Sequence, residues 1–541
     1  MHKSGLWPYN SLPQPTTPLP VVVSLLCVFF LVALALRLSA SRFGLPFLYD
    51  PDEIAFTEPA IRIIRSGDWN PGWFGHPGTT TIYLNVAVFE FVHSLRSYFA
   101  SVQELPEDYY INPYAYTYAA RAAYSVISSC SVVLTYLLGR QIGLGTFPSL
   151  TAAAIVAFSS LHIIYSALIR TDTLAAFLML SSLIYCTGIV RDGGIRHYIA
   201  SGMFAGVAIA TKYPLVICCI TIAAAHVLSN KNWLSEWPKL GVAAVATVVA
   251  TFFVSPYLFI DYESALSDIS REAFNKKSTA AGQGIVFNLL WYGERSQNWF
   301  GNLPIIGVLI GVLVCFIEKR KTYAPPVIFF VLFIVFISSL SVRWDRWLVP
   351  IIPVGAILCG ITLNFFCSLR GRMAAPGRLL ALVLASTAVF QFAVAARSTV
   401  ATRIASDTRT AAAVWISESL PAGSLILVDS GGPQLPREKF RIGLFGFGDG
   451  SGRVSFVYRN EYMNVIPRFS DPARSDAEKV LQEGKPDYVV LSSSVSNRYR
   501  GREEWQQFET LFAAGDVIRE VKPGIDAERG PTLWIIRVAK D

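Results

Sequence analysis

The stretch PVVVSLLCVFFLVALALRL, residues 20–38, decides the class of fold. It is long enough to cross a bilayer as a single helix. The residues that follow, RLSASRFGLPF, contain no small-residue cleavage site, so we interpret the stretch as a retained anchor rather than a removed signal. Ten further apolar runs predict more spans: 118–138, 148–167, 173–190, 197–211, 213–228, 240–258, 302–317, 324–340, 347–366 and 378–396. The sequence therefore predicts a mainly α-helical, polytopic membrane bundle of about eleven spans.

Charge is distributed unevenly along the 541 residues. Only 16% of them are charged, against about 25% in ordinary soluble proteins. Residues 1–400 hold 27 Lys or Arg and 19 Asp or Glu, whereas 401–541 hold 19 of each, so the net charge of +8 lies wholly in the first part. This excludes a typical cytosolic enzyme, and it favours basic loops that orient a membrane protein over a nucleic-acid surface. The eight cysteines lie in or beside apolar runs without a CxxC pair, which is typical of buried thiols.

One run, residues 77–97, is ambiguous because Asn85, Glu90 and His93 interrupt it. If it does not cross, eleven spans alternate from a cytoplasmic N-terminus. The cytoplasmic loops are then 1–19, 139–147, 191–196, 229–239, 318–323 and 367–377. Together with Arg378 at the next helix start, they hold twelve Lys or Arg and three Asp or Glu. That asymmetry agrees with the positive-inside rule. We therefore predict that 77–97 is a helix lying along the outer membrane surface.

Three segments are then expected on the outer side: a first loop with surface helices at 39–117, a loop at 259–301, and the tail. We predict a transmembrane domain over 1–396 and a small α/β domain over 397–541. In this tail, helices are expected at 403–419 and 503–514. Strands are expected at SLILVD (424–429), RVSFVY (453–458), DYVVLSSS (487–494) and TLWIIRV (532–538).

Opposite charges gather at the outer ends of the predicted spans, where they are costly unless they have a function. Six separate segments supply them: Asp50, Asp52 and Glu53; His76; Arg121; Arg170 and Asp172; Lys212; and Arg343, Asp345 and Arg346. Lys212 stands out because no other charge lies between Tyr198 and Asn230. No spacing here forms a metal site, and there is no HExxH, P-loop or GxSxG motif.

Each of these residues also has a structural interpretation. Acids in an outer loop are usually solvated, and Asp172 could cap the helix that follows it. The arginines could be interfacial anchors that reach the lipid headgroups. His76, which precedes a proline, could be a turn residue.

Together, the charges suit transfer of a group from a lipid phosphate. A phosphate leaving group needs cations to hold its developing charge; Arg does so with two hydrogen bonds, Lys as a point charge. An attacking hydroxyl needs a carboxylate as general base. One carboxylate and a set of cations at the membrane surface satisfy both needs.

The order of these motifs resembles the polyprenyl-phosphate-sugar glycosyltransferases of the C superfold, in particular bacterial relatives of the protein O-mannosyltransferases and the lipid A aminoarabinose transferases. The stretch DPDEIAFTEPAIRIIRSGDWNPGWFGHPG (50–78) resembles the family's first outer loop. TYAARAAYSVISSCSVVLTYLLGR, YSALIRTDTLAAF, GVAIATKYPLVI and RWDRWLVPIIP resemble later landmarks in the same order. The likeness covers roughly residues 20–400, and each motif alone is weak.

The resemblance implies a role for each candidate residue. It makes Asp52 the catalytic carboxylate, with Glu53 beside it. It makes Asp172 the second acidic position, Lys212 and Arg346 basic positions that face the lipid phosphate, and Arg121 the basic residue that opens a span. We predict that these four residues, together with Arg343 and His76, bind substrate. The sequence departs from the family pattern at His-Pro-Gly and at Arg-Trp before LVP. The sequence identifies no certain cofactor, although a divalent cation could take part.

The implied partners are a polyprenyl-phosphate-linked sugar donor and a glycan, lipid or protein acceptor. The expected location is the inner (plasma) membrane, with the active site and tail on the extracytoplasmic side. A transporter or flippase of a lipid-linked or anionic substrate is the alternative, but its internal repeat is not seen. A membrane-anchored binding protein would leave eleven spans unexplained.

Overall fold

The computed structural model describes residues 18–45, 48–75, 78–229, 233–273, 282, 284–429, 431–436, 439–445 and 476–539. The chain divides into two compact units. We call Met1–Ala40, Pro71–Thr81 and Arg121–Thr399 the membrane unit, and Ser41–Asn70, Ile82–Ala120 and Val400–Asp541 the sheet unit. Most of the first outer loop thus belongs to the same compact unit as the C-terminal part of the chain.

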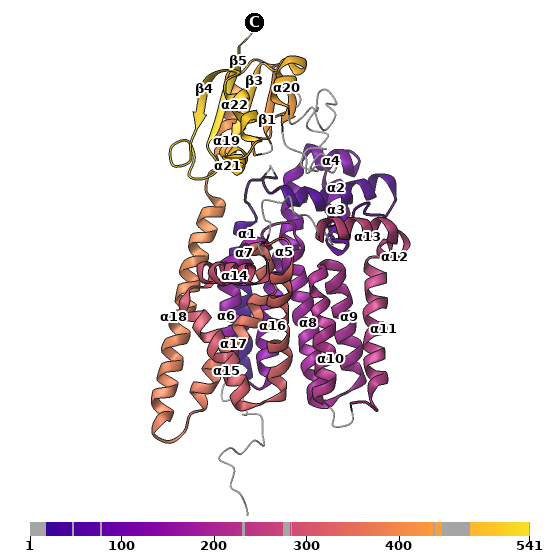
Figure 1. Ribbon diagram of the computed structural model, residues 1–541, viewed down its shortest axis with the longest axis vertical. Helices are drawn as coiled ribbons and strands as arrows, with labels where there is room; N and C mark the ends of the chain where they lie inside the picture. The colour runs from indigo at the N-terminus through magenta and orange to yellow at the C-terminus, as the bar shows by residue number, and fades with distance from the viewer. Residues whose placement is uncertain are drawn as a thin grey trace, which may run out of the picture. The chain divides into compact units, whose positions relative to one another are not determined.

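The membrane unit is built almost entirely of helices (Figure 1). Its elements are α1 (Leu19–Ala40), the start of α3 (Thr79–Phe99), most of α5 (Pro113–Ile142), α6 (Thr146–Phe158), α7 (Ser160–Ser166), α8 (Thr171–Asp192), α9 (Ile195–Thr211), η1 (Tyr213–Val216), α10 (Ile217–Ser229), α11 (Trp237–Val254), α12 (Tyr257–Ile260), α13 (Tyr262–Ala273), α14 (Ile285–Phe300), α15 (Asn302–Glu318), η2 (Lys321–Tyr323), α16 (Ala324–Ser339), η3 (Asp345–Leu348), α17 (Ile351–Ser368), η4 (Gly371–Met373) and α18 (Ala374–Ile404).

All eleven predicted apolar runs fall on helices, which confirms the mainly helical, polytopic prediction. Among the described residues, seven helices are long and apolar enough to cross a membrane, or eight if the bent pair α6–α7 is one span. The runs on α9, on η1–α10 and on α15 form shorter helices, so a count of eleven crossings stays a prediction. The ambiguous run forms α3, which is not among the seven.

Small residues let α9 and α11 approach closely, and Figure 1 shows α8, α9, α10 and α11 side by side. A Cβ added to Gly202 or to Gly206 would lie 2.3 Å from a carbonyl oxygen of α11. The hydroxyl of Thr251 also donates to the Gly206 carbonyl, at 3.1 Å. This is the small-xxx-small packing of membrane helices. It fixes the helix that ends just before Lys212.

A buried arginine supports the 53° bend between α6 and α7. Arg37 of α1 is fully buried and donates to the carbonyls of Val156 and Ala157, at 3.0 and 2.9 Å. The bend interrupts the helical hydrogen bonds there, so these carbonyls need another donor. Arg37 also donates to Ser128, and His162 lies 3.3 Å from it. The first membrane helix is therefore part of the core of this unit.

The sheet unit combines surface helices with a five-stranded sheet. Its elements are α2 (Pro51–Ser66), most of α3, α4 (Leu105–Ile111), the start of α5, the end of α18, α19 (Thr408–Ser419), β1 (Leu425–Asp429), β2 (Arg441–Phe445), α20 (Ala477–Gly484), β3 (Tyr488–Ser492), α21 (Ser493–Tyr499), α22 (Trp505–Phe512), β4 (Gly515–Val521) and β5 (Leu533–Val538). The strand order is β2-β1-β3-β5-β4. β1 is parallel to β2 and β3, and β5 is antiparallel to β3 and β4.

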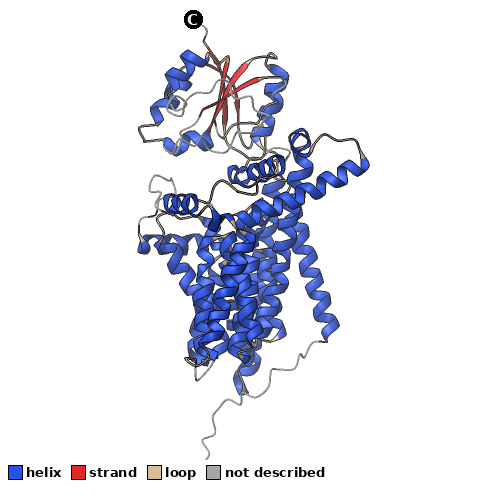
Figure 2. Cartoon of the chain, turned by 90° about the vertical axis from the view of Figure 1, so that its right-hand side faces the viewer, coloured by secondary structure: helices blue, strands red, loops and turns tan. Residues whose placement is uncertain are grey.

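Helices cover both faces of this sheet (Figure 2). Ile426 and Val428 pack against α19, whereas Leu427 of the same strand packs against α20 and α22. This alternation follows from the period of two in a strand. The predicted α/β tail is thus confirmed, with three of its four strands in place. The fourth, RVSFVY, lies outside the described residues. The predicted helix at 403–419 is interrupted at Asp407, which caps α19.

Candidate active site

Lys212 and Asp172 form a buried ion pair in the membrane unit. Lys212 follows the last turn of α9, and Asp172 lies in the first turn of α8. Their side chains are bonded directly, from the ammonium to one carboxylate oxygen, and both residues are at most 5% exposed. The N-cap position of α8 is Arg170, so Asp172 does not cap the helix as the structural interpretation supposed. A buried charge of either sign is costly unless it is paired in this way.

Lys212 and Arg346 line one cavity of about 710 Å³, although they are far apart in the sequence. Arg346 lies in η3, with its guanidinium 4.6 Å from the centre of the Trp344 ring. The positive charges of Arg346 and Arg170 both act on Lys212. We call Asp172, Lys212 and Arg346 the cradle. It carries two cations and one acid, so it favours an anion in the cavity.

The rest of the cavity wall is mainly apolar. Helix α13 contributes Tyr262, Ala265, Leu266 and Ile269, which recur at the spacing of one helix face. The wall is completed by residues of the neighbouring elements, among them Val216, Leu258, Phe336, Leu340 and Trp347. Two cations in an otherwise mainly apolar wall suit a ligand with an anionic head and a hydrocarbon chain.

Helix α14 supports the segment that carries Arg346. The Trp299 indole donates to the Asp345 carboxylate at 3.2 Å, and Arg295 lies 3.6 Å from that carboxylate. The Tyr292 hydroxyl accepts from the Trp344 backbone N–H at 3.4 Å. Arg343 lies over the Trp291 ring, 5.1 Å from its centre. Arg343, predicted to bind substrate, therefore contacts α14.

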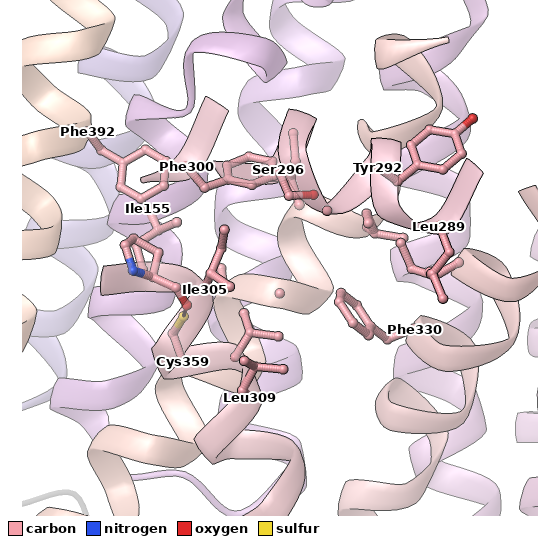
Figure 3. Close-up of a pocket in the computed structure, with 18 residues that line it drawn as sticks. Ile155, Leu289, Tyr292, Ser296, Phe300, Ile305, Leu309, Phe330, Cys359 and Phe392 are labelled. Carbon is pink, nitrogen blue, oxygen red and sulfur yellow. Dashed lines mark hydrogen bonds between the residues drawn. The ribbon is translucent and has the colours of Figure 1, made fainter. Parts of the chain in front are cut away.

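A second cavity, of about 230 Å³, lies among α6 and α14–α18 of the membrane unit (Figure 3). Its walls are almost wholly apolar, with Phe300, Phe330 and Phe392 among the lining residues. Tyr292 contributes its ring, and its hydroxyl is directed away from the cavity. This cavity offers lipid-compatible surface but no charged group.

The carboxylates of the YDPDE motif lie at the start of α2, in the sheet unit. Asp50 is the N-cap, and its carboxylate accepts from the Asp52 N–H at 3.1 Å. Pro51 occupies the first helical position, where its missing N–H costs nothing. Asp52 is half-buried. Glu53 is fully buried. Burial raises the pKa of Tyr109 in α4, and the charge of Glu53 raises it further.

The remaining predicted residues are less informative. Arg121 is fully buried in α5, two turns after the helix begins, and the described residues that line the larger cavity do not include it. His76 lies outside the described residues, although Gly75 before it lines that cavity. Within the part of the chain that the structure describes, no three His, Cys, Asp or Glu side chains are grouped to hold a metal ion. Nothing here assigns a place to a divalent cation.

Sequence reasoning missed α13 and α14, which it treated as a loop at 259–301. The residues 262, 265, 266 and 269 recur at i, i+3, i+4 and i+7, and this pattern could have revealed the helix that lines the cavity. Trp299 and Arg295 had no such signal, because their partner Asp345 comes from a distant segment.

Comparison with known proteins matches residues 117–256 to the family described as dolichyl-phosphate-mannose-protein mannosyltransferase. This segment runs from the start of α5 to just beyond α11 and contains Asp172 and Lys212. No curated protein sequence matches the chain.

Solved structures match over nearly the full length. ArnT from Cupriavidus metallidurans in the apo state gives a TM-score of 0.57 at 16% identity, covering 95% of this chain and 98% of that chain. The chain has the C-type glycosyltransferase fold. ArnT bound to undecaprenyl phosphate gives 0.55 at 16% identity, over 96% of this chain and 98% of that one.

A solved structure from an archaeon shares this fold at lower sequence identity. The oligosaccharyltransferase AglB from Archaeoglobus fulgidus, in complex with an inhibitory peptide and a dolichol-phosphate, gives 0.52 at 11% identity, over 90% of this chain and 71% of that one. The predicted resemblance is confirmed in fold over most of the chain, and in sequence over residues 117–256. The chain is a multi-pass membrane protein.

Proposed function

We propose that this protein transfers a sugar from a polyprenyl-phosphate carrier to an acceptor on the extracytoplasmic side of the membrane. The observation that carries the proposal is the cavity that Lys212 and Arg346 line together with mainly apolar residues. A polyprenyl phosphate has the matching chemistry, an anionic head on a hydrocarbon chain. Two of the similar folds were solved with undecaprenyl phosphate and dolichol-phosphate, which supports this choice of carrier.

The proposed reaction is a single displacement at the anomeric carbon. The acceptor hydroxyl attacks this carbon, the bond to the phosphate oxygen breaks, and the phosphate leaves with the bonding electrons. Lys212 and Arg346 hold the charge that develops on the leaving phosphate. Asp52 takes the proton of the acceptor. Attack from the face opposite the phosphate inverts the configuration of the sugar.

The local structure of α2 supports Asp52 over its neighbours as the general base. Asp50 is occupied as a helix cap, and Glu53 is fully buried beside α4. Asp52 alone of the three is neither the cap nor fully buried. A base must reach the proton that it removes, so partial exposure favours Asp52.

The decisive variant is Asp52→Asn, which changes the charge but hardly the shape. Turnover of a polyprenyl-phosphate sugar should fall by about 10²–10⁴, the usual loss for a general base, while carrier binding is retained. Asp50→Asn is the matched control, because Asn also caps helices and should leave turnover near that of the wild type. Full turnover in Asp52→Asn would refute the assignment. A product of retained configuration, determined by NMR, would refute the single displacement.

We also infer that the protein lies in the inner (plasma) membrane with residues 397–541 outside. The basic predicted cytoplasmic loops support this orientation. A periplasmic reporter fused after Asp541 should be active, and a reporter active only in the cytoplasm would contradict it.

A further inference from the structure

Within the sheet unit, the C-terminal residues 400–541 contact the segment that leads into α2. Tyr49 immediately precedes Asp50, the cap of α2, and its backbone and side chain both contact residues of the C-terminal part of the sheet unit. The Tyr49 hydroxyl lies 2.9 Å from the Thr410 hydroxyl, and Arg409 donates to the Tyr49 carbonyl at 3.4 Å. The Arg409 guanidinium lies over the Tyr49 ring, 3.9 Å from its centre.

A buried carboxylate holds this arginine in place. Asp407 accepts two hydrogen bonds from the Arg409 guanidinium, at 2.8 and 2.9 Å, and one from Arg529 at 3.2 Å. Two-point pairing of this kind fixes the plane of a guanidinium. Asp407 also accepts from the Arg409 backbone N–H as the N-cap of α19. The stacking partner of Tyr49 is thus anchored to the start of a packed helix.

Two further contacts join the same segment to the C-terminal part of the sheet unit. Two guanidinium groups lie over the Phe43 ring, that of Arg403 at 4.3 Å and that of Arg529 at 4.2 Å from its centre. Gln434, after β1, donates to the Leu48 carbonyl at 3.3 Å. We call Asp407, Arg409, Arg529 and Tyr49 the clamp. Its contacts end one residue before the helix cap and three residues before Asp52.

We propose that the clamp is a positioning device, through which the C-terminal domain fixes the first turn of α2 and thereby the carboxylate of Asp52. A segment held at Leu48 and Tyr49 leaves little freedom for the turn that starts at Asp50. This role rests on the proposed function of Asp52 as general base. It gives the C-terminal part of the sheet unit a role in turnover that does not require the clamp residues to touch the substrate.

The test compares Arg409→Ala with Arg519→Ala in the full-length protein. Arg519 pairs with Asp526 in the same domain, at a site that does not include Tyr49, so it is a matched control. Arg409→Ala should lower kcat by about 10- to 100-fold, the scale of a catalytic group misplaced by about 1 Å, with donor affinity unchanged. Arg519→Ala should change neither quantity. Arg409→Lys, which keeps the charge but loses the planar fork, should fall between wild type and Arg409→Ala.

Two further measurements separate positioning from general destabilisation. Hydrogen exchange of peptides covering residues 48–56 should accelerate in Arg409→Ala, with the strands of the sheet unaffected. In the Asp52→Asn background, Arg409→Ala should cause no further loss of rate, since it acts through the absent carboxylate. Unchanged exchange at 48–56, an additive loss of rate, or accelerated exchange with full turnover would each overturn the clamp as a positioning device.

Failure of the proposed function gives a different pattern. If Asp52→Asn keeps full turnover, the base assignment is wrong. The rate of hydrogen exchange in residues 48–56 then decides alone whether the clamp holds the start of α2. Tyr49→Phe, which keeps the ring and removes only the hydroxyl, provides a milder variant should Arg409→Ala fail to fold. It should accelerate exchange less than Arg409→Ala does.

Discussion

The cradle and the clamp are made of the same kinds of group but differ in what covers their cations. Each has one buried carboxylate and two basic side chains. In the clamp, Arg409 and Arg529 are closed over the rings of Tyr49 and Phe43. In the cradle, Lys212 and Arg346 face a cavity of about 710 Å³. Since Arg346 of the cradle also lies over a ring, that of Trp344, the comparison indicates that the cavity onto which the excess charge opens, rather than the lack of an aromatic partner, makes a cation set a binding site.

The largest expected effect is on the cradle. Lys212→Met leaves Asp172 as an unpaired buried charge, which should cost about 3–5 kcal/mol of stability. The double variant Lys212→Met, Asp172→Leu removes both charges and should regain most of that loss, measured by thermal unfolding in detergent. The double variant should still fail to bind polyprenyl phosphate. Normal binding in it would mean that the cradle is a structural joint like the clamp.

Arg346→Ala should separate binding from stability. Because Arg346 lines the cavity, its loss should change lipid binding more than it changes thermal stability. Binding of polyprenyl phosphate should weaken by about 1.5–3 kcal/mol, the worth of a charged hydrogen bond. Arg409→Ala, measured in parallel, should leave that affinity intact. Equal affinities for all three proteins would remove the distinction drawn above.

A third expectation concerns how buried carboxylates respond to pH in the sheet unit. Burial raises the pKa of Asp429 to about 7, although backbone N–H groups of Ser492 and Gly431 donate to it. An unfolded Asp has a pKa of about 3.9, so between pH 4 and 7 the folded state retains a proton that the unfolded state loses. Stability should therefore fall as pH rises through this window, and stay level above it.

Asp407 should behave in the opposite way. Burial opposes its ionisation, but Arg409 and Arg529 outweigh burial and hold its pKa below the usual value. Its contribution is present above about pH 4 and is lost only as pH falls through the lowered pKa. The Asp429 expectation is tested with Asp429→Asn. In this variant, the protection of the β1 and β3 amides against hydrogen exchange, after correction for the intrinsic exchange rate, should no longer change between pH 5 and 7. Protection that rises with pH in the wild type would show that the backbone donors stabilise the Asp429 anion.

The smallest expected effect tests the support of Arg346. Trp299→Phe keeps the apolar packing and removes the indole N–H that donates to Asp345. Affinity for polyprenyl phosphate should fall by about 0.5–1 kcal/mol, the net worth of one hydrogen bond. A lipid-binding assay at several concentrations resolves a change of this size. A loss as large as that of Arg346→Ala would make Trp299 part of the cradle.

The sequence predicted the helices of the membrane unit well because apolar runs at membrane length are a strong signal. Lys212 was also recognisable, as a lone charge in a long charge-free segment. Its approach to Arg346 was expected from the family resemblance and from the place of both residues at the outer ends of predicted spans, whereas no local spacing pattern links them. The contacts of the clamp were not foreseen, because Tyr49 and Arg409 are 360 residues apart and no local pattern links them.

The sheet was harder to predict for local reasons. β2 is five residues long and is followed by glycines, so it carries little of the usual strand pattern. Among the strands that the structure describes, β4 lies at the edge of the sheet and pairs with β5 alone, and most of its side chains are at least partly exposed. Edge strands commonly lack the apolar run of a central strand.

The bond between Arg37 and the bend of α6–α7 limits which helices could replace α1. A generic hydrophobic helix would anchor the chain equally well, yet it would leave the carbonyls of Val156 and Ala157 without that donor. Each such group costs several kcal/mol at membrane depth. The first helix is therefore not an interchangeable part, and exchanges of it between related chains should succeed only when the arginine travels with it.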